Sequence, residues 1–319
     1  MKTVGIICPV YQEEEVIDLF HERLTSAIKD LSARYSFKIL YVVDPSPDRT
    51  EEILASLSRR DPNIGVLVLS RRFGHQVALT AGMDHCDADA LIMLDTDLQH
   101  PPELIPELLS RYEEGADVVQ TLRQDSSGRS WFERVTSGWF YALLARFSTI
   151  DLQPGAADYR LLSRRVVEIF REQIREQNQF VRGMVRWVGF RAVYVPFECK
   201  SREGGQSKYG ITKLVNFAIQ GIFSFSKIPL RLATFFGAVA ALVGFVYGVF
   251  VVVQYFIGPL IVPGWTSLLA LVAFLGGVQL IFMGVIGEYI GLIFDEVKSR
   301  PLYLIDRAYG HVNRQAGTR

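Results

Sequence analysis

The chain has 319 residues, of which 49% are hydrophobic, and its 34 basic side chains balance its 34 acidic ones. A chain this apolar, with no net charge, is not disordered. It also lacks the basic footprint of a nucleic-acid-binding protein, so we expect no nucleic-acid partner. Cys8, Cys86 and Cys199 lie far apart and form no CxxC pair, which excludes a disulfide framework and a zinc ribbon.

The N-terminal part of the chain alternates short apolar runs with helix-like stretches. The apolar runs are VGII near Val4, KILYVV ending at Val43, IGVLVL ending at Leu69, ALIML ending at Leu94 and DVVQ from Asp117. The helix-like stretches are 14–35, 50–58, 76–86 and 102–114. This alternation predicts an α/β fold with a mainly parallel sheet and helices on both faces. Ligands of such sheets bind at the carboxyl ends of the strands.

The most informative strand end is Asp95-Thr96-Asp97. Two carboxylates at this spacing can converge on a divalent cation, and hard oxygen ligands suit Mg²⁺ or Mn²⁺ bridging a diphosphate. A solvated acidic turn is the alternative, whereas an EF-hand is excluded because its glycine and closing glutamate are missing. Pro101 and Pro102 then open a helix whose positive amino end would face the same anion.

Two later segments combine apolar surface with positive charge. Residues 130–150 contain several Trp, Phe and Leu side chains beside Arg134 and Arg146, which predicts an interfacial amphipathic helix. Residues 211–228 are a second candidate. An ordinary core helix is the alternative for each.

A long uncharged stretch runs from Leu232 to Gly287. It predicts two transmembrane helices, 232–257 and 266–287, because about 20 apolar residues cross a bilayer. A buried hairpin of a soluble protein is disfavoured because neither helix has a polar face. Basic residues flank both ends and the connecting loop carries no charge, so both ends are expected in the cytoplasm.

These features predict four parts. Residues 1–206 form a cytoplasmic catalytic domain, 207–231 a juxtamembrane amphipathic segment, 232–287 the membrane hairpin and 288–319 a cytoplasmic tail. Residues 200–231 carry six basic side chains and one acidic one, a collar suited to anionic headgroups.

Eight segments, in order along most of the chain, resemble the inverting GT-A glycosyltransferases that move a sugar from a nucleotide onto a polyprenyl phosphate. The family includes dolichyl-phosphate mannose synthases and bactoprenol glucosyltransferases, and the two-span ending most resembles the latter. The segments are PVYQEEEVI (9–17), SRRFGHQVALTAGMD (70–84), LDTDLQHPPELIPEL (94–108), ADYRLLSR (157–164), FVRGMVRWVGF (180–190), SREGGQSKYG (201–210), SFSKIPLR (224–231) and GEYIGLIFDEVKSRPLY (287–303). The resemblance implies a GT-A, Rossmann-like sheet.

The resemblance also implies a donor site. Asp95, Asp97 and Gln99 match the metal and diphosphate motif, which implies Mg²⁺ or Mn²⁺ as cofactor. Further positions matching the nucleotide-sugar site are Pro9, Tyr11, Glu13, Asp44, His75, Gln76 and Ser207, together with Asp95. Val43 and Pro45 depart from the acid and glycine that the family often has beside Asp44, which puts base contacts from this loop in doubt. For His75, capping of the third helix is the alternative.

Asp158 matches the carboxylate of the family's GDFRL segment. The acceptor phosphate is already an anion, so the expected role is an orienting group or weak base, with a structural pair to Arg160 as the alternative. Arg202, Ser207 and Lys208 match a basic loop that folds over the diphosphate; contact with lipid headgroups is the other interpretation. The catalytic candidates are Asp158, Asp97, Arg202 and Lys208.

On the acceptor side, Arg123, Arg134 and Ser137 best match the family's phosphate-binding set, although their spacing is not identical. The expected enzyme is an inverting hexosyltransferase of the inner (plasma) membrane that uses UDP-glucose and undecaprenyl phosphate. GDP-mannose, UDP-N-acetylhexosamine and UDP-aminoarabinose are alternative donors. Two other functions stay open, a processive polysaccharide synthase and a catalytically silent scaffold, as does homo-oligomerisation. The synthase motif QxxRW fails here because Gly183 follows Arg182.

Overall fold

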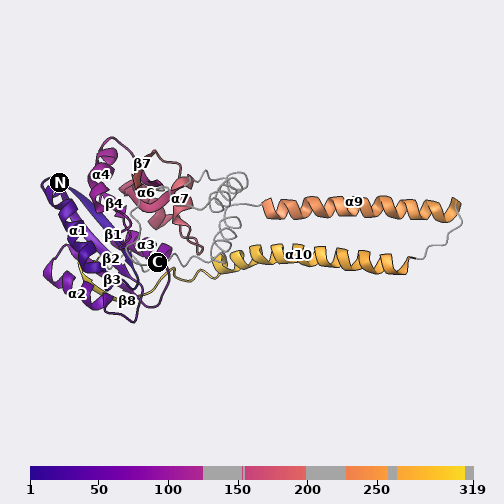
Figure 1. Ribbon diagram of the computed structural model, residues 1–319, viewed down its shortest axis with the longest axis horizontal. Helices are drawn as coiled ribbons and strands as arrows, with labels where there is room; N and C mark the ends of the chain where they lie inside the picture. The colour runs from indigo at the N-terminus through magenta and orange to yellow at the C-terminus, as the bar shows by residue number, and fades with distance from the viewer. Residues whose placement is uncertain (125–152, 154, 199–227, 258–263, 313–319) are drawn as a thin grey trace. The chain divides into compact units, whose positions relative to one another are not determined.

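The computed structural model describes residues 1–124, 153, 155–198, 228–257 and 264–312 (Figure 1). The chain divides into two compact units. The first is an α/β unit that takes in the N-terminal part of the chain and the residues from Arg300 onward, and the second is a helical unit that contains the two long C-terminal helices.

The α/β unit is built on one eight-stranded sheet with the order β7-β5-β6-β4-β1-β2-β3-β8. Its first five strands are β1 (Lys2–Val10), β2 (Tyr35–Val43), β3 (Ile64–Leu69), β4 (Ala90–Met93) and β5 (Val118–Gln124). The last three are β6 (Ala156–Ser163), β7 (Ala192–Glu198) and β8 (Ile305–Gly310). Four strand pairs are parallel, namely β1–β2, β1–β4, β2–β3 and β5–β7. Three pairs are antiparallel, namely β4–β6, β5–β6 and β3–β8. The predicted α/β class with a GT-A-like sheet is confirmed, and the sheet, which was expected to be mainly parallel, is mixed.

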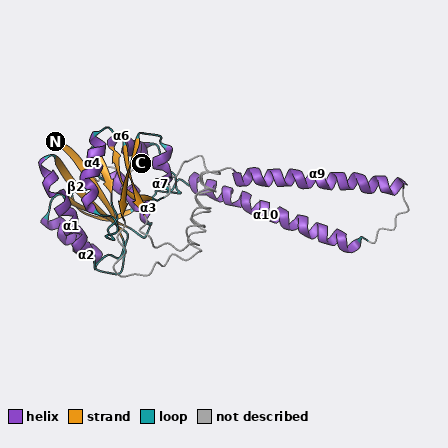
Figure 2. Cartoon of the chain, turned by 45° about the horizontal axis from the view of Figure 1, so that its top comes forward, coloured by secondary structure: helices purple, strands orange, loops and turns teal. Residues whose placement is uncertain are grey.

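Helices cover both faces of this sheet (Figure 2). They are α1 (Ile17–Lys29), α2 (Thr50–Arg60), α3 (His75–His85), α4 (Ile105–Glu113), α6 (Arg164–Glu172) and α7 (Val181–Trp187), with short 3-10 turns at Asp30–Ala33 and Pro102–Leu104. The predicted stretches 14–35, 50–58, 76–86 and 102–114 correspond to α1, α2, α3 and the Pro102 turn with α4.

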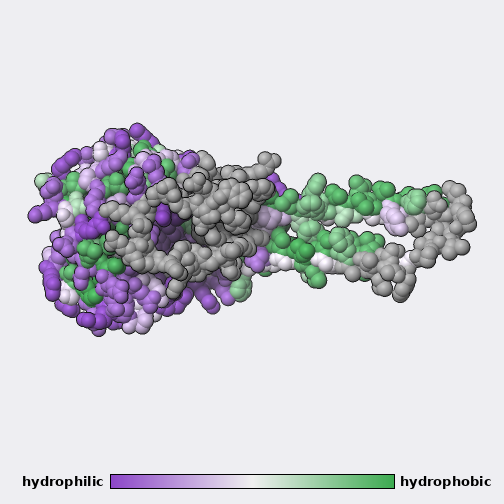
Figure 3. Space-filling model, in the orientation of Figure 1, coloured by the Kyte–Doolittle hydropathy of each residue, from purple (hydrophilic) through white to green (hydrophobic). Residues whose placement is uncertain are grey.

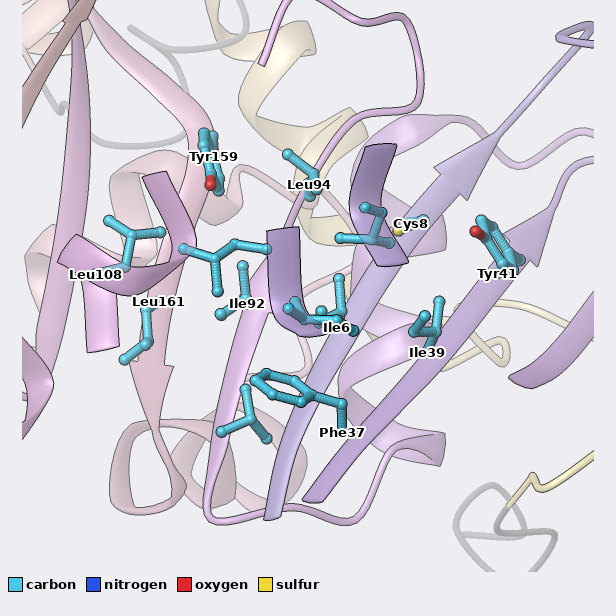
Figure 4. Packing of buried hydrophobic residues seen from close by; sticks show 14 of the residues in the cluster. Ile6, Cys8, Phe37, Ile39, Tyr41, Ile92, Leu94, Leu108, Tyr159 and Leu161 are labelled. Atoms are coloured by element: carbon cyan, nitrogen blue, oxygen red, sulfur yellow. The ribbon is translucent and has the colours of Figure 1, made fainter. Parts of the chain in front are cut away.

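Alternate residues of β1 face the two helical layers. Ile6 belongs to the core cluster that includes Phe20 of α1 and Leu108 of α4 (Figure 4). Its neighbour Ile7 faces the other way and touches α3, where a Cβ on Gly82 would lie only 2.2 Å from Ile7 Cγ2. Glycine at position 82 therefore lets α3 pack close to the sheet, and this brings the amino end of α3 to the carboxyl ends of the strands.

The helical unit contains α9 (Ile228–Ile257) and α10 (Trp265–Val297). Apolar side chains cover their described surfaces, and two stretches, Ile228–Phe250 and Phe274–Val297, are long and apolar enough to cross a membrane (Figure 3). The predicted C-terminal two-helix hairpin is confirmed. The second helix continues beyond the predicted end at Gly287 through several charged residues.

Residues near the C-terminus join the sheet. β8 pairs antiparallel with β3, from Gly65 opposite Gly310 to Leu69 opposite Ile305. Gly310 has φ of +68°, and a Cβ there would lie 2.2 Å from the carbonyl oxygen of Ile64, so glycine is needed for this close pairing. The predicted amphipathic segment 130–150, and 211–228 apart from Ile228, lie outside the described residues.

Candidate active site

The strand ends bring the first acidic residue of the DxD motif next to two histidines. Asp95 Oδ1 lies 2.7 Å from His75 Nε2, at the start of α3, and Asp95 Oδ2 lies 3.4 Å from His100 Nδ1. Burial raises the pKa of Asp95, but the hydrogen bond and charge of His75 outweigh this effect, so the pKa lies below its usual range. The His75 ring is directed at Asp95, and among the described residues α3 has no side-chain hydrogen bond at its N-cap.

The second acidic residue lies in a strained loop. Asp97 Oδ1 accepts the Gln99 N–H at 3.1 Å, and Leu98 between them has φ of +61°. A branched apolar residue in this region costs about 1–3 kcal/mol, and such strain concentrates at functional sites. The rest of the fold must therefore maintain the strained conformation of the loop that contains Asp97.

The donor set fits a hard divalent cation. The described residues contain no group of three His, Cys, Asp or Glu side chains that could hold a metal ion by themselves. Mg²⁺ does not require one, because it is commonly bound by one or two carboxylates while substrate phosphates and water complete its shell. Asp95 and Asp97 are the two carboxylates that could hold such a cation, and enzymes of the GT-A type commonly use divalent metals.

A second charged cluster surrounds Asp158 on β6. Its Oδ1 accepts a hydrogen bond from Arg160, which is fully buried, and its Oδ2 accepts one from Arg182 of α7 at 3.1 Å. Gln76 Nε2 lies 3.3 Å from the same Oδ2, and His75 Nδ1 lies 4.0 Å from it. His75 thus lies between the carboxylates of Asp95 and Asp158 and links the two clusters.

These neighbours determine the charge of Asp158. Burial alone raises the pKa of its carboxyl, but the charges of Arg182, Arg160 and His75 outweigh burial and hold the pKa well below its usual range. The carboxylate is therefore ionised at neutral pH and is a weak base. The structural pair with Arg160 is formed, and the same carboxylate also faces His75 and Gln76, which were predicted to line the donor site.

Asp44, at the end of β2, is buried and holds a loop. Its carboxylate oxygens accept the N–H groups of Phe73 at 3.0 Å and Gly74 at 2.9 Å. Gly74 has φ of +96° and is the residue before α3. Asp44 therefore shapes the turn that delivers His75 and Gln76 to the site.

The predicted base-binding residues lie at the end of β1 and in the segment after it. Pro9 lies in the buried part of that strand, and its carbonyl oxygen accepts a hydrogen bond at 3.4 Å from the hydroxyl of Thr96, the residue between the two motif aspartates. The Arg72 guanidinium lies over the ring of Tyr11, 3.9 Å from the centroid. The Glu13 N–H donates to Thr50 Oγ1 at 3.0 Å. Pro9 is thus the residue through which the end of β1 contacts the acidic motif.

Most of the residues predicted for the acceptor site and the basic loop lie outside the described part of the chain. Arg123 lies exposed near the end of β5, and its N–H donates to Gly155 O at 2.8 Å. Five predicted residues lie outside the described part of the chain: Arg134, Ser137, Arg202, Ser207 and Lys208.

Sequence reasoning did not assign roles to Arg182, His100 or Arg72. Arg182 and His100 lie inside segments that carry the family resemblance, so position within those segments was the available signal. Arg72 also lies in such a segment, in the polar stretch after β3, where ligands of this fold bind.

Comparison with known proteins agrees with this geometry. The model described as Glycosyl transferase family 2 matches residues 5–170, and the model described as GtrB C-terminal hairpin matches residues 228–293. The SfII prophage-derived bactoprenol glucosyl transferase of Shigella flexneri is 40% identical over 96% of this chain and 98% of that protein. The prophage bactoprenol glucosyl transferase homolog of Escherichia coli is 40% identical over 95% and 98%.

A third relative, the uncharacterized glycosyltransferase YkcC of Bacillus subtilis, is 39% identical over 98% of this chain and 95% of that protein. The likenesses extend through both the acidic strand ends and the apolar hairpin. The chain belongs to glycosyltransferase family 2, and it is a transferase that ends in a GtrB-type C-terminal hairpin.

Proposed function

We propose that the chain is a membrane-anchored, inverting hexosyltransferase that moves glucose from UDP-glucose onto undecaprenyl phosphate. The observation that carries the proposal is the environment of Asp158, whose two arginine partners make it a weak base. A sugar hydroxyl must lose a proton during attack, whereas a phosphate acceptor is already an anion. The near full-length likeness to bactoprenol glucosyl transferases supports a polyprenyl phosphate as that acceptor.

The bond changes in this reaction balance without a proton. A phosphate oxygen of the acceptor attacks the anomeric carbon of glucose from the side opposite the diphosphate. The bond from that carbon to the diphosphate oxygen breaks, and UDP leaves with the electron pair. The protein must therefore position two anions and stabilise the charge that builds up on the departing diphosphate.

The donor side is assigned to the strand ends. Asp95, Asp97 and Gln99 would hold Mg²⁺ or Mn²⁺, which would neutralise charge on the diphosphate. The base, ribose and sugar are assigned to Pro9, Tyr11, Glu13, Asp44, His75, Gln76, Asp95 and Ser207. His75 joins the two carboxylate clusters, and this supports a place for the sugar between metal site and Asp158.

The acceptor side combines Asp158 as orienting group with assignments from family resemblance. Arg202 and Lys208 would hold the departing diphosphate, and Arg123, Arg134 and Ser137 the lipid phosphate. The two apolar helices fit membrane spans. Because positive charge flanks the hairpin and its connecting loop carries none, we place the catalytic domain and both termini on the cytoplasmic side of the inner membrane.

A transfer assay with the full chain in lipid nanodiscs tests this function. Undecaprenyl phosphate and Mg²⁺ or Mn²⁺ are supplied with labelled UDP-glucose, GDP-mannose, UDP-N-acetylglucosamine or UDP-aminoarabinose in separate reactions. We expect label in the organic phase from UDP-glucose. Label from another donor alone would reassign the sugar, and a polymer would favour a polysaccharide synthase. No turnover with any donor would contradict the function and favour a silent scaffold.

A further inference from the structure

A buried junction joins α3, the segment after α6 and the C-terminal segment. The Tyr303 hydroxyl donates to Asp84 Oδ2 at 2.7 Å, and Arg175 Nη1 donates to Asp84 Oδ1 at 2.8 Å. Asp84 is 6% exposed and Tyr303 8%, so their hydrogen bonds replace contacts with water. Burial and the Asp84 carboxylate raise the pKa of Tyr303, which keeps its hydroxyl protonated and donating.

The junction is the first of three contacts along one face of α3. Asp84, Thr80 and Gln76 are four residues apart, so they lie one above the other on the helix. The Thr80 hydroxyl donates a hydrogen bond to Gln179 Oε1 at 2.9 Å, and the Val181 N–H donates one to Gln76 Oε1 at 3.1 Å. Three successive turns of α3 therefore hold the segment that leads into α7.

This segment ends at the candidate active site. Arg182, the next residue after Val181, donates to Asp158 Oδ2 at 3.1 Å. The side-chain oxygen of Gln76 accepts the Val181 hydrogen bond, and its side-chain nitrogen lies 3.3 Å from the same Asp158 oxygen. The register of residues 175–181 on α3 therefore sets where the Arg182 guanidinium meets the catalytic carboxylate.

The C-terminal segment reaches the junction soon after α10 ends at Val297. Gln177 Nε2 donates to the carbonyl oxygen of Arg300 at 2.5 Å, and the Ser70 N–H donates to that of Leu304 at 2.8 Å. Tyr303 lies beyond both matched family regions, which end at residues 170 and 293. Its contact with Asp84 joins positions 219 residues apart in the sequence.

We propose that Tyr303 is a positioning residue for sugar transfer, which fixes the 175–181 segment on α3 and so places Arg182 against Asp158. The activity readout rests on the proposed function. The hydroxyl acts through Asp84 and Arg175, and it has no hydrogen bond to those assigned donor residues that the structure describes. Its removal should therefore lower the rate of the chemical step more than the affinity for the donor.

The test compares Tyr303→Phe with Tyr309→Phe in the full chain. The control removes the same hydroxyl from the same C-terminal segment, where it donates to Glu51 at 3.0 Å on α2. We expect Tyr303→Phe to lower kcat about tenfold with KM for the donor within twofold, because small misplacement of a reacting group has large kinetic effects. Tyr309→Phe should keep kcat within twofold. Hydrogen exchange of the Val181 amide should quicken in Tyr303→Phe only.

A second variant, Gln179→Ala, removes the middle contact. If both residues act through one segment, the double variant should be about as slow as the slower single variant, since coupled residues are not additive. A kcat for Tyr303→Phe equal to that of the control, or unchanged Val181 exchange, would overturn the proposal even if unfolding temperature falls. Faster exchange in a protein that transfers no sugar from any donor would instead contradict the proposed function, and only the hold of Tyr303 on residues 175–181 would be supported.

Discussion

Asp158→Asn separates the structural and chemical roles of the central carboxylate. Arg160 is fully buried, and the Asp158 side chain is 12% exposed, so the change leaves a guanidinium without its closest counter-charge. Removing one partner of a buried ion pair destabilises a protein by about 3–5 kcal/mol. For a domain of this size each kcal/mol lowers the unfolding midpoint by roughly 2–4 °C, so we expect a fall of roughly 6–20 °C.

Asp87→Asn is the matched control. Asp87 lies 3.1 Å from Arg164, but both side chains are about half exposed, and surface pairs contribute about 0–1 kcal/mol. Adding Arg160→Met to Asp158→Asn removes the buried charge, so stability should largely return while transfer stays lost. The assay is tryptophan fluorescence during heating, with transfer measured on the same samples. An Asp158→Asn midpoint equal to that of the control would refute the interpretation of the cluster.

The same variant carries a pH dependence of defined sign. The pKa of Asp158 in the folded chain lies below the unfolded value, so its contribution to stability is complete above about pH 4, near the unfolded pKa. It is lost as the pH falls toward the folded pKa. The difference in midpoint between wild type and Asp158→Asn should therefore shrink in acid, and a constant difference would contradict the low pKa.

Other changes test the remaining parts of the site. Asp97→Ala should abolish transfer without a large change in midpoint, and near-normal activity would contradict the metal assignment. Asp44→Ala removes the acceptor of two backbone N–H groups, so stability should fall by about 1–3 kcal/mol and KM for the donor should rise in steady-state assays. Gly82→Ala forces a Cβ against Ile7 and should destabilise the chain by about 1–3 kcal/mol in denaturant titrations, whereas Gly284→Ala, with open space around it, should not.

The N-terminal strands were predictable because each is a short run of buried residues between turn signals. The described sheet keeps β1, β2 and β4 in parallel register, as buried runs in alternation with helices indicate. β8 carries no such signal, since its sequence IDRAYG is polar and mostly exposed. Its pairing with β3 depends on tertiary contacts, which local sequence patterns do not reveal.

The site was partly predictable for the same reason. Asp95 and His75 follow strands, so their meeting at one edge of the sheet follows from topology alone. The contact of Arg182 with Asp158 joins two segments through the packing of α7, and nothing in either segment specifies the other. The contact of Tyr303 was still harder to predict, because its partner Asp84 lies inside a helix and not at a strand end.

The anomeric configuration of the lipid product tests the central claim most directly. The purified chain is incubated with UDP-α-glucose, undecaprenyl phosphate and Mg²⁺, and the extracted lipid is analysed by mass spectrometry and NMR. We predict one hexose per undecaprenyl phosphate in the inverted β configuration, with one UDP released for each. A product with retained configuration, more than one sugar per lipid, or no glycosylated lipid at all would contradict direct attack by the acceptor phosphate.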